Sequence, residues 1–137
     1  MSSTLRQAKG ENGWGLTMDQ DNVKLGRLGE DAAASYLQNA GFKILDRNVR
    51  TRSGEIDLVA SKKGELYFVE VKTRGQSSFG APLESLPFYR QKRLAQMAQW
   101  YLRSKKISAG TCYHLSLMGI DASQTPMKLE FLPDITL

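Results

Sequence analysis

Three charged residues that could carry metal-dependent chemistry stand inside two of the most apolar segments of the chain. Asp57 lies in the segment "GEIDLVA", and Glu70 and Lys72 lie in the segment "LYFVEVKTR". A carboxylate or an ammonium group that is buried without a partner carries a large desolvation penalty. We therefore expect these side chains to contact one another, water or a cation.

The spacing of the three residues predicts where they meet. If residues 66–73 form a strand, Glu70 and Lys72 project to the same face of it. The turn "SKKG" joins this strand to "EIDLVA", so a hairpin would bring Asp57 beside Glu70. The two carboxylates and the main-chain carbonyl of Val71 are the hard oxygen donors that Mg2+ prefers. The pattern predicts a site for Mg2+ or Mn2+, at which Lys72 assists a water that attacks a phosphodiester.

A further acidic ligand is predicted on the first helix. Apolar residues recur at helical spacing from Val23 to Ala40, and Gly41 stands where a helix usually ends. On this helix Glu30 flanks the apolar stripe, whereas Asp31 points to the solvated side. We expect Glu30 to face the sheet and to complete the site.

The elements that position these residues follow from the hydrophobic periodicity. The pattern predicts strands over residues 42–50, 55–60, 65–73, 111–120 and 127–133. It also predicts a second helix from an N-cap at Ser85 to about Lys106, with an inner face formed by Leu94, Met97, Ala98, Tyr101 and Leu102. The order αβββαββ predicts an α/β fold, a mixed sheet of about five strands with flanking helices.

Composition and charge bound the domain organisation and the class of partner. We expect a flexible tail over residues 1–22 and a single domain over residues 23–137. Nineteen Lys and Arg against fourteen Asp and Glu give a net charge of +5, which favours a polyanionic partner such as nucleic acid. Cys112 is the one cysteine, so we expect a buried free thiol in a reducing compartment. Because no apolar run reaches the ~18 residues of a membrane span and no signal peptide is evident, we expect a cytoplasmic protein without a membrane partner.

Basic residues near the predicted site could contact phosphates. The candidates for nucleic-acid binding are Arg50, Arg52, Arg74, Lys92 and Arg93. The loop that follows Arg74 contains Phe79, which could stack on a base or anchor the loop in the core. The charges of the second helix could equally form a solvated face.

Five segments carry a resemblance to a known family, namely "GRLGEDAAASYLQNAGFKILDRNVR", "GEIDLVA", "LYFVEVKTR", "FGAPLES" and "KRLAQMAQWYL". Over roughly residues 24–137 the chain resembles the YraN-like family of uncharacterised bacterial proteins, which is related to Holliday-junction resolvases in the PD-(D/E)xK nuclease superfamily. The resemblance implies a restriction-endonuclease-like core. It also places Glu30, Asp57, Glu70 and Lys72 on the helix carboxylate, the two strand acids and the lysine of that superfamily.

Two positions depart from the pattern of the family. Ile56 stands where the name of the superfamily implies a proline, and many relatives share this difference. His114 lies in "CYHLSL", where similar sequences tend to carry an acid in "RFDVV". We expect His114 to contact the edge of the core rather than to take part in catalysis.

The sequence leaves three functions open. The first is a Mg2+- or Mn2+-dependent endonuclease acting on branched DNA, for which a homodimer would supply two equivalent cuts. The second is a non-catalytic nucleic-acid-binding module that keeps the carboxylates for structure, for example as an ion pair between Glu70 and Lys72. The third is a protein-interaction scaffold.

Overall fold

The order of helices and strands agrees with the predicted αβββαββ. The computed structural model describes residues 16–75 and 86–135. The elements are α2 (Leu16–Asn39), β2 (Lys43–Thr51), β3 (Gly54–Lys62), β4 (Glu65–Arg74), α3 (Phe88–Ser104), β5 (Tyr113–Asp121) and β6 (Lys128–Leu132). Each strand begins and ends within two residues of its predicted bounds. The predicted α/β class is confirmed.

The strands form one mixed sheet in the order β2-β3-β4-β5-β6. β4 and β5 are parallel, and the other neighbouring strands are antiparallel. β3 and β4 form the predicted hairpin, whose turn has positive φ at Lys63 and Gly64. The parallel pair needs a long crossover, and α3 lies within it.

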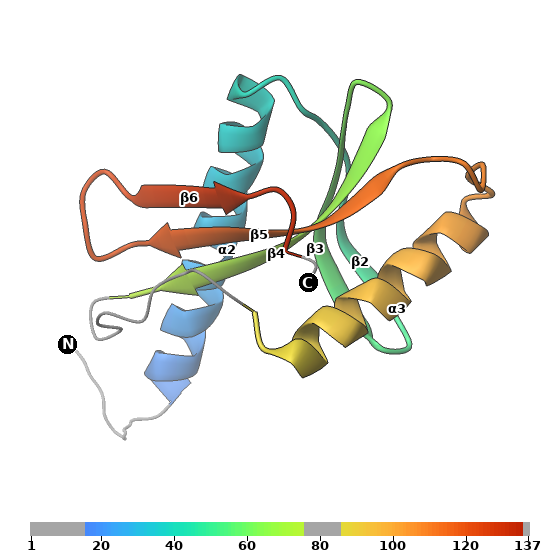
Figure 1. The fold of residues 1–137 in the computed structure, drawn as a ribbon. Helices are drawn as coiled ribbons and strands as arrows, with labels where there is room; N and C mark the ends of the chain where they lie inside the picture. The colour runs from blue at the N-terminus through green and yellow to red at the C-terminus, as the bar shows by residue number, and fades with distance from the viewer. Residues whose placement is uncertain (1–15, 76–85, 136–137) are drawn as a thin grey trace.

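The two helices lie on opposite faces of the sheet (Figure 1). On one face Ala33 and Leu37 of α2 are buried with Leu58. On the other face Leu94 of α3 packs with Phe68. Four of the five residues predicted for the inner face of α3 are buried, namely Leu94, Met97, Ala98 and Tyr101, and the fifth, Leu102, is partly buried against them. Covering both faces explains why β3, β4 and β5 read as nearly continuous apolar runs.

The bounds of the helices correct parts of the prediction. α2 begins at Leu16, so residues 16–22 are helical rather than part of a tail, because "LTMDQDN" contains no Gly or Pro to interrupt the helix. Residues 1–15 lie outside the described residues, as do Ser85 and Phe79. α3 begins at Phe88 after the N-cap Pro87 and ends at Ser104, just before Lys106 takes a left-handed φ of 54°.

The expected burial of Cys112 is wrong. Cys112 is exposed, because it lies just before β5 begins at Tyr113. The buried part of β5 begins only at Leu115 and extends to Ile120.

Candidate active site

Asp57 lies at the point where β3 and β4 separate. The paired residues of these strands run from Lys62 and Glu65 to Leu58 and Val69. One residue further, the Asp57 carboxylate accepts a hydrogen bond of 2.8 Å from the main-chain N–H of Val71. A side chain thus satisfies a part-buried donor that a continuing ladder would have paired. We call Asp57, Glu70 and Val71 the fork.

The Asp57 carboxyl is held in an unfavourable environment for its charge. Burial raises its pKa to about 6, against the lowering effect of the Val71 hydrogen bond. Glu30 and Glu55 raise the pKa further, and Arg90 lowers it. Desolvation and the repulsion from nearby acids both disfavour the ionised carboxylate, so a cation at the fork would offset both effects.

A glycine brings α2 close enough for Glu30 to reach the same region. A Cβ atom on Gly29 would lie 1.9 Å from the Oγ1 atom of Thr73 on β4, so no larger residue fits. Glu30 follows directly and is half-buried. Partial burial and then Glu55 raise its pKa, while Arg47 lowers it.

Glu30 lines two adjoining hollows in the surface. One of about 270 Å³ also contains Val71 and Thr73. The other, of about 380 Å³, also contains Arg50 and Glu55. The predicted helix acid therefore lies between the fork and the β2–β3 turn, where a phosphate-bearing ligand would find both acidic and basic groups.

Glu70 of the fork is paired with a residue that the prediction did not include. The Arg90 guanidinium on α3 donates a hydrogen bond to the Glu70 carboxylate, whose side chain is only 10% exposed. The non-catalytic alternative predicted an ion pair between Glu70 and Lys72, whereas the observed partner of Glu70 is Arg90. Lys72 is half-buried and pairs in register with Gly119 of β5.

The predicted acids are neighbours without forming a closed cluster. Within residues 16–75 and 86–135, the three carboxyl groups of Glu30, Asp57 and Glu70 do not come within 4.8 Å of one another as a set. The electrostatic coupling of Glu30 to Asp57 and the Val71 hydrogen bond do join the helix acid to the fork. Glu70 stands apart from them, on Arg90.

The predicted nucleic-acid-binding residues lie in three places. Arg50 is 90% exposed and lies 3.8 Å from Glu55, and Arg52 is exposed in the β2–β3 turn. Arg74 ends β4 and its Nε atom is buried without a hydrogen-bond partner. Lys92 and Arg93 are exposed on the first turns of α3.

The start of α3 combines cations with exposed rings. Phe88 and Tyr89 are 62% and 61% exposed. The Lys92 ammonium lies 5.7 Å from the centre of the Phe88 ring, and the Arg93 guanidinium lies 6.0 Å from that of Tyr89. Such a surface offers both phosphate contacts and stacking to a nucleic acid.

Glu55 and Arg90 are the residues of this region that the prediction omitted. Glu55 precedes Asp57 by two positions on β3, so strand periodicity could have placed the two acids on one face. Arg90 lay among several basic residues of one helix, and no spacing singled it out. Its role depends on how α3 docks on the sheet.

Among the described residues, no helix is both long enough and apolar enough to cross a membrane.

The sequence of this chain matches a family model and is similar to those of many bacterial proteins. The sequence model of the uncharacterised protein family UPF0102 matches residues 29–122, more than half of the chain. A UPF0102 protein of Syntrophotalea carbinolica is 49% identical over 90 residues, which are 66% of this chain and 73% of the relative. One of Moorella thermoacetica is 42% identical over 95 residues, which are 69% of this chain and 79% of the relative. The predicted resemblance to the YraN-like family is confirmed, and the chain belongs to the uncharacterised protein family UPF0102.

Proposed function

We propose that this protein is a metal-dependent nuclease that cleaves DNA phosphodiesters, with branched DNA as its preferred substrate. The single observation that carries the proposal is the fork. The desolvated Asp57 carboxyl, with a pKa of about 6, accepts a hydrogen bond from the Val71 peptide, and two further acids, Glu30 and Glu55, lie near it. Perturbed acids beside surface hollows are typical of catalytic sites. The proposal includes a cytoplasmic location and a homodimer, since a junction needs two equivalent cuts.

The donors of this region fit Mg2+ or Mn2+. Asp57, Glu30 and the Val71 carbonyl are hard oxygen groups, and Glu70 would join them by exchanging Arg90 for the cation. When bound, such a cation activates water and stabilises charge on a phosphodiester. Lys72, two residues beyond Glu70 on β4, would orient the attacking water and stabilise the negative charge that develops on it.

Contacts with the phosphate backbone are assigned to exposed cations. Arg50 and Arg52 lie at the β2–β3 turn, and Lys92 and Arg93 lie at the start of α3. These two places adjoin, because the Cβ position of Gly54 in β3 lies 3.5 Å from the Arg93 side chain. Binding through them should weaken steeply as the salt concentration rises.

A second candidate is a nucleic-acid-binding module without catalysis. The observation that favours it is the ion pair of Glu70 with Arg90, which satisfies a buried carboxylate with no metal. In such a module the Asp57 carboxylate would accept the hydrogen bond of the Val71 N–H and stabilise the point where β3 and β4 separate.

The test is a cleavage assay on junction, flap, single-stranded and duplex DNA with Mg2+, Mn2+ or EDTA. We expect metal-dependent cutting by the unaltered protein that is lost in Asp57→Ala and Lys72→Ala. Asp31→Asn is the matched control, because Asp31 is an exposed acid adjacent to Glu30 that pairs with Arg47.

The assay separates the candidates. Binding of DNA by every variant, with no cutting under any metal, supports the module. Absence of binding to every nucleic acid at low salt rejects both and leaves the scaffold. Cutting that survives in Asp57→Ala contradicts the proposed site.

A further inference from the structure

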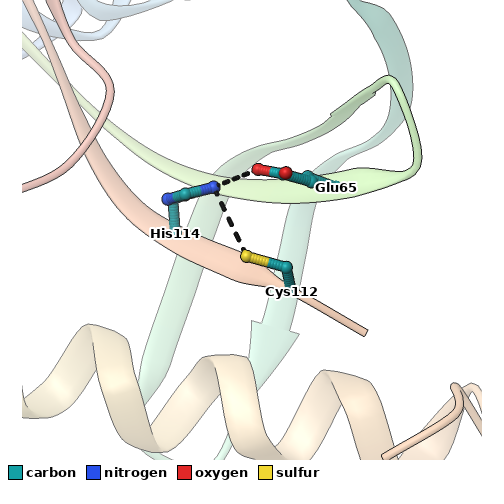
Figure 2. Close-up of side chains that lie close together, drawn as sticks. All are labelled: Glu65, Cys112 and His114. Carbon is teal, nitrogen blue, oxygen red and sulfur yellow. Dashed lines mark hydrogen bonds and ion pairs between the residues drawn. The ribbon is translucent and has the colours of Figure 1, made fainter. Parts of the chain in front are cut away.

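A second group of potential ligands lies at the other end of β4. Figure 2 shows Glu65 reaching from β4 toward His114 and Cys112. The His114 Nε2 atom lies 2.6 Å from the Glu65 carboxylate and 3.8 Å from the Cys112 sulfur. One ligand atom from each residue lies within 4.8 Å of the others. We call these three residues the Cys–His cluster.

The fold brings the cluster together through the parallel pair β4 and β5. Cys112 and His114 are two residues apart in an extended segment, so their side chains point the same way. The Leu66 N–H donates a hydrogen bond of 3.0 Å to the Cys112 carbonyl, which fixes the start of β4 beside this segment. Glu65, immediately before Leu66, is thereby held next to the cysteine.

The imidazole of His114 is oriented by its neighbours. Its ring stacks on Tyr67, with 4.6 Å between the ring centres and 18° between the planes. The Nδ1 atom lies 3.6 Å from the Asp134 carboxylate, while Nε2 points to Glu65 and Cys112. Histidines that bind metals commonly hold one nitrogen on the metal and the other on a carboxylate. The arrangement therefore leaves Nε2 as the metal-binding nitrogen.

We propose that Glu65, Cys112 and His114 bind a transition-metal cation of the Zn2+ type. Nitrogen, sulfur and carboxylate oxygen are the donors that zinc selects, whereas Mg2+ disfavours sulfur and nitrogen. From usual zinc–ligand distances, the donors of a tetrahedral site are about 3.2–3.8 Å apart. The 3.8 Å between nitrogen and sulfur meets this spacing, and the half-exposed Glu65 side chain can rotate to make room.

The proposed site would tie three parts of the chain together. Glu65 begins β4, and Cys112 and His114 lead into β5. Asp134 belongs to the C-terminal segment, which is fastened to β5 where Ile135 N–H donates to the Leu115 carbonyl at 2.9 Å. Three protein ligands leave a fourth position for water. The site is independent of the proposed nuclease, because it uses none of the fork residues.

The test is a Co2+ titration of the full chain, kept reduced with a phosphine. Thiolate bound to Co2+ gives a near-ultraviolet charge-transfer band, and Cys112 is the only cysteine, so the band reports this site alone. We expect the band to saturate at one Co2+ per chain and to be removed by equimolar Zn2+. It should vanish in Cys112→Ser and His114→Asn, and affinity should fall at least tenfold in Glu65→Gln and about tenfold or more in Asp134→Asn.

Asp57→Asn is the matched control, because it alters the other candidate metal site and should keep the band unchanged. Circular dichroism of each variant reports whether it folds, and exposed Cys112 makes Cys112→Ser the safest replacement. Absence of the band at micromolar protein and Co2+, or its persistence in His114→Asn, overturns the proposal. Without a band the cluster is only a hydrogen-bonded contact at the edge of the sheet, and a band that persists in His114→Asn would mean that Co2+ binds Cys112 without His114.

Discussion

The two ends of β4 hold their carboxylates in opposite ways. Glu70, near the end of the strand, is buried and paired with Arg90, and Asp57 on the neighbouring strand β3 is desolvated near other acids. Glu65, at the start of the strand, is half-exposed and meets the imidazole of His114. The fork offers oxygen donors, whereas the Cys–His cluster offers nitrogen, sulfur and oxygen.

This difference predicts which cation each end would favour. Hard oxygen donors with unbalanced negative charge favour Mg2+ or Mn2+, and a mixed donor set favours zinc. At the fork a guanidinium and a main-chain N–H already compensate part of the charge, so a cation must compete with Arg90. At the Cys–His cluster a metal competes only with protons and with the Glu65–His114 contact.

The largest expected effect is on the proposed catalysis at the fork. Asp57→Ala should reduce DNA cleavage by about a thousandfold, because an interaction worth several kcal/mol in the transition state disappears. Single-turnover cleavage at saturating protein measures the loss. Asp31→Asn should remain within about twofold of the unaltered protein, since that acid pairs with Arg47 on the surface.

The next effect concerns the approach of α2 to the fork. Gly29→Ala should lower the free energy of unfolding by about 3 kcal/mol, because the new methyl group would overlap Thr73. Urea denaturation followed by circular dichroism measures it. Gly26→Ala is the control on the same helix: its Cβ meets nothing within 4 Å, so up to about 1 kcal/mol of stability should be gained.

Thr73→Ala in the Gly29→Ala background sharpens this prediction. Removing the Oγ1 and Cγ2 atoms eliminates two of the three close contacts, so much of the lost stability should return. No recovery in the double variant would mean that the helix backbone itself, rather than the Thr73 side chain, requires the glycine.

A pH dependence should follow from Asp57. Its folded pKa of about 6 exceeds the ordinary value of 3.8, so the protonated form favours folding. The contribution is complete below about pH 4 and is lost as the pH rises through 6, up to about 3 kcal/mol. Denaturation at several pH values without metal should show Asp57→Asn more stable than the unaltered protein at pH 7 and similar to it near pH 4.

Glu30 should keep the stability of Asp57→Asn from becoming fully independent of pH. Its pKa is also raised, so part of the decline should persist in that variant. Equal pH profiles for the two proteins would show that Asp57 is not desolvated in solution, and the fork would lose its distinction from the Cys–His cluster.

The sequence predicted the fold because periodicity records which faces are buried. The apolar run around Phe68 and the turn at Lys63 and Gly64 were sufficient to predict β4 and the β3–β4 hairpin. The hairpin accounts for the position of Asp57 beside Val71, whereas the Glu70 carboxylate turns to Arg90. The start of α2 was missed because its first turns carry no apolar stripe that marks a packed face.

The side-chain partners were less predictable, because they join elements that are distant in the sequence. Arg90 reaches Glu70 only through the docking of α3, and any of several basic residues could have done so. The spacing of Cys112 and His114 was visible, but Glu65 becomes their neighbour only in the parallel register of β4 and β5. Local patterns do not specify that register.

The smallest effect tests whether Arg90 occupies the place of a cation. Arg90→Met should destabilise the protein by about 2 kcal/mol without metal, because it leaves the Glu70 carboxylate buried without its guanidinium. We expect less than a fully buried pair would lose, since the Arg90 side chain is 43% exposed and water can reach it. Thermal denaturation measures the change. Glu70→Gln in the same background should recover most of the loss, because no charge remains to be compensated.

Addition of Mg2+ or Mn2+ to Arg90→Met then distinguishes the two ends of β4. If Glu70 is a metal ligand masked by Arg90, millimolar Mg2+ should stabilise Arg90→Met more than the unaltered protein, and this gain should vanish in Asp57→Asn/Arg90→Met. His114→Asn removes the Glu65–His114 contact at the other end and should gain no more from Mg2+ than the unaltered protein, because the fork is unchanged and the donors left at the Cys–His cluster include a thiol. Equal responses of all variants to Mg2+ would mean that Arg90 is a structural partner of Glu70, and the non-catalytic module would then be the better account of the fork.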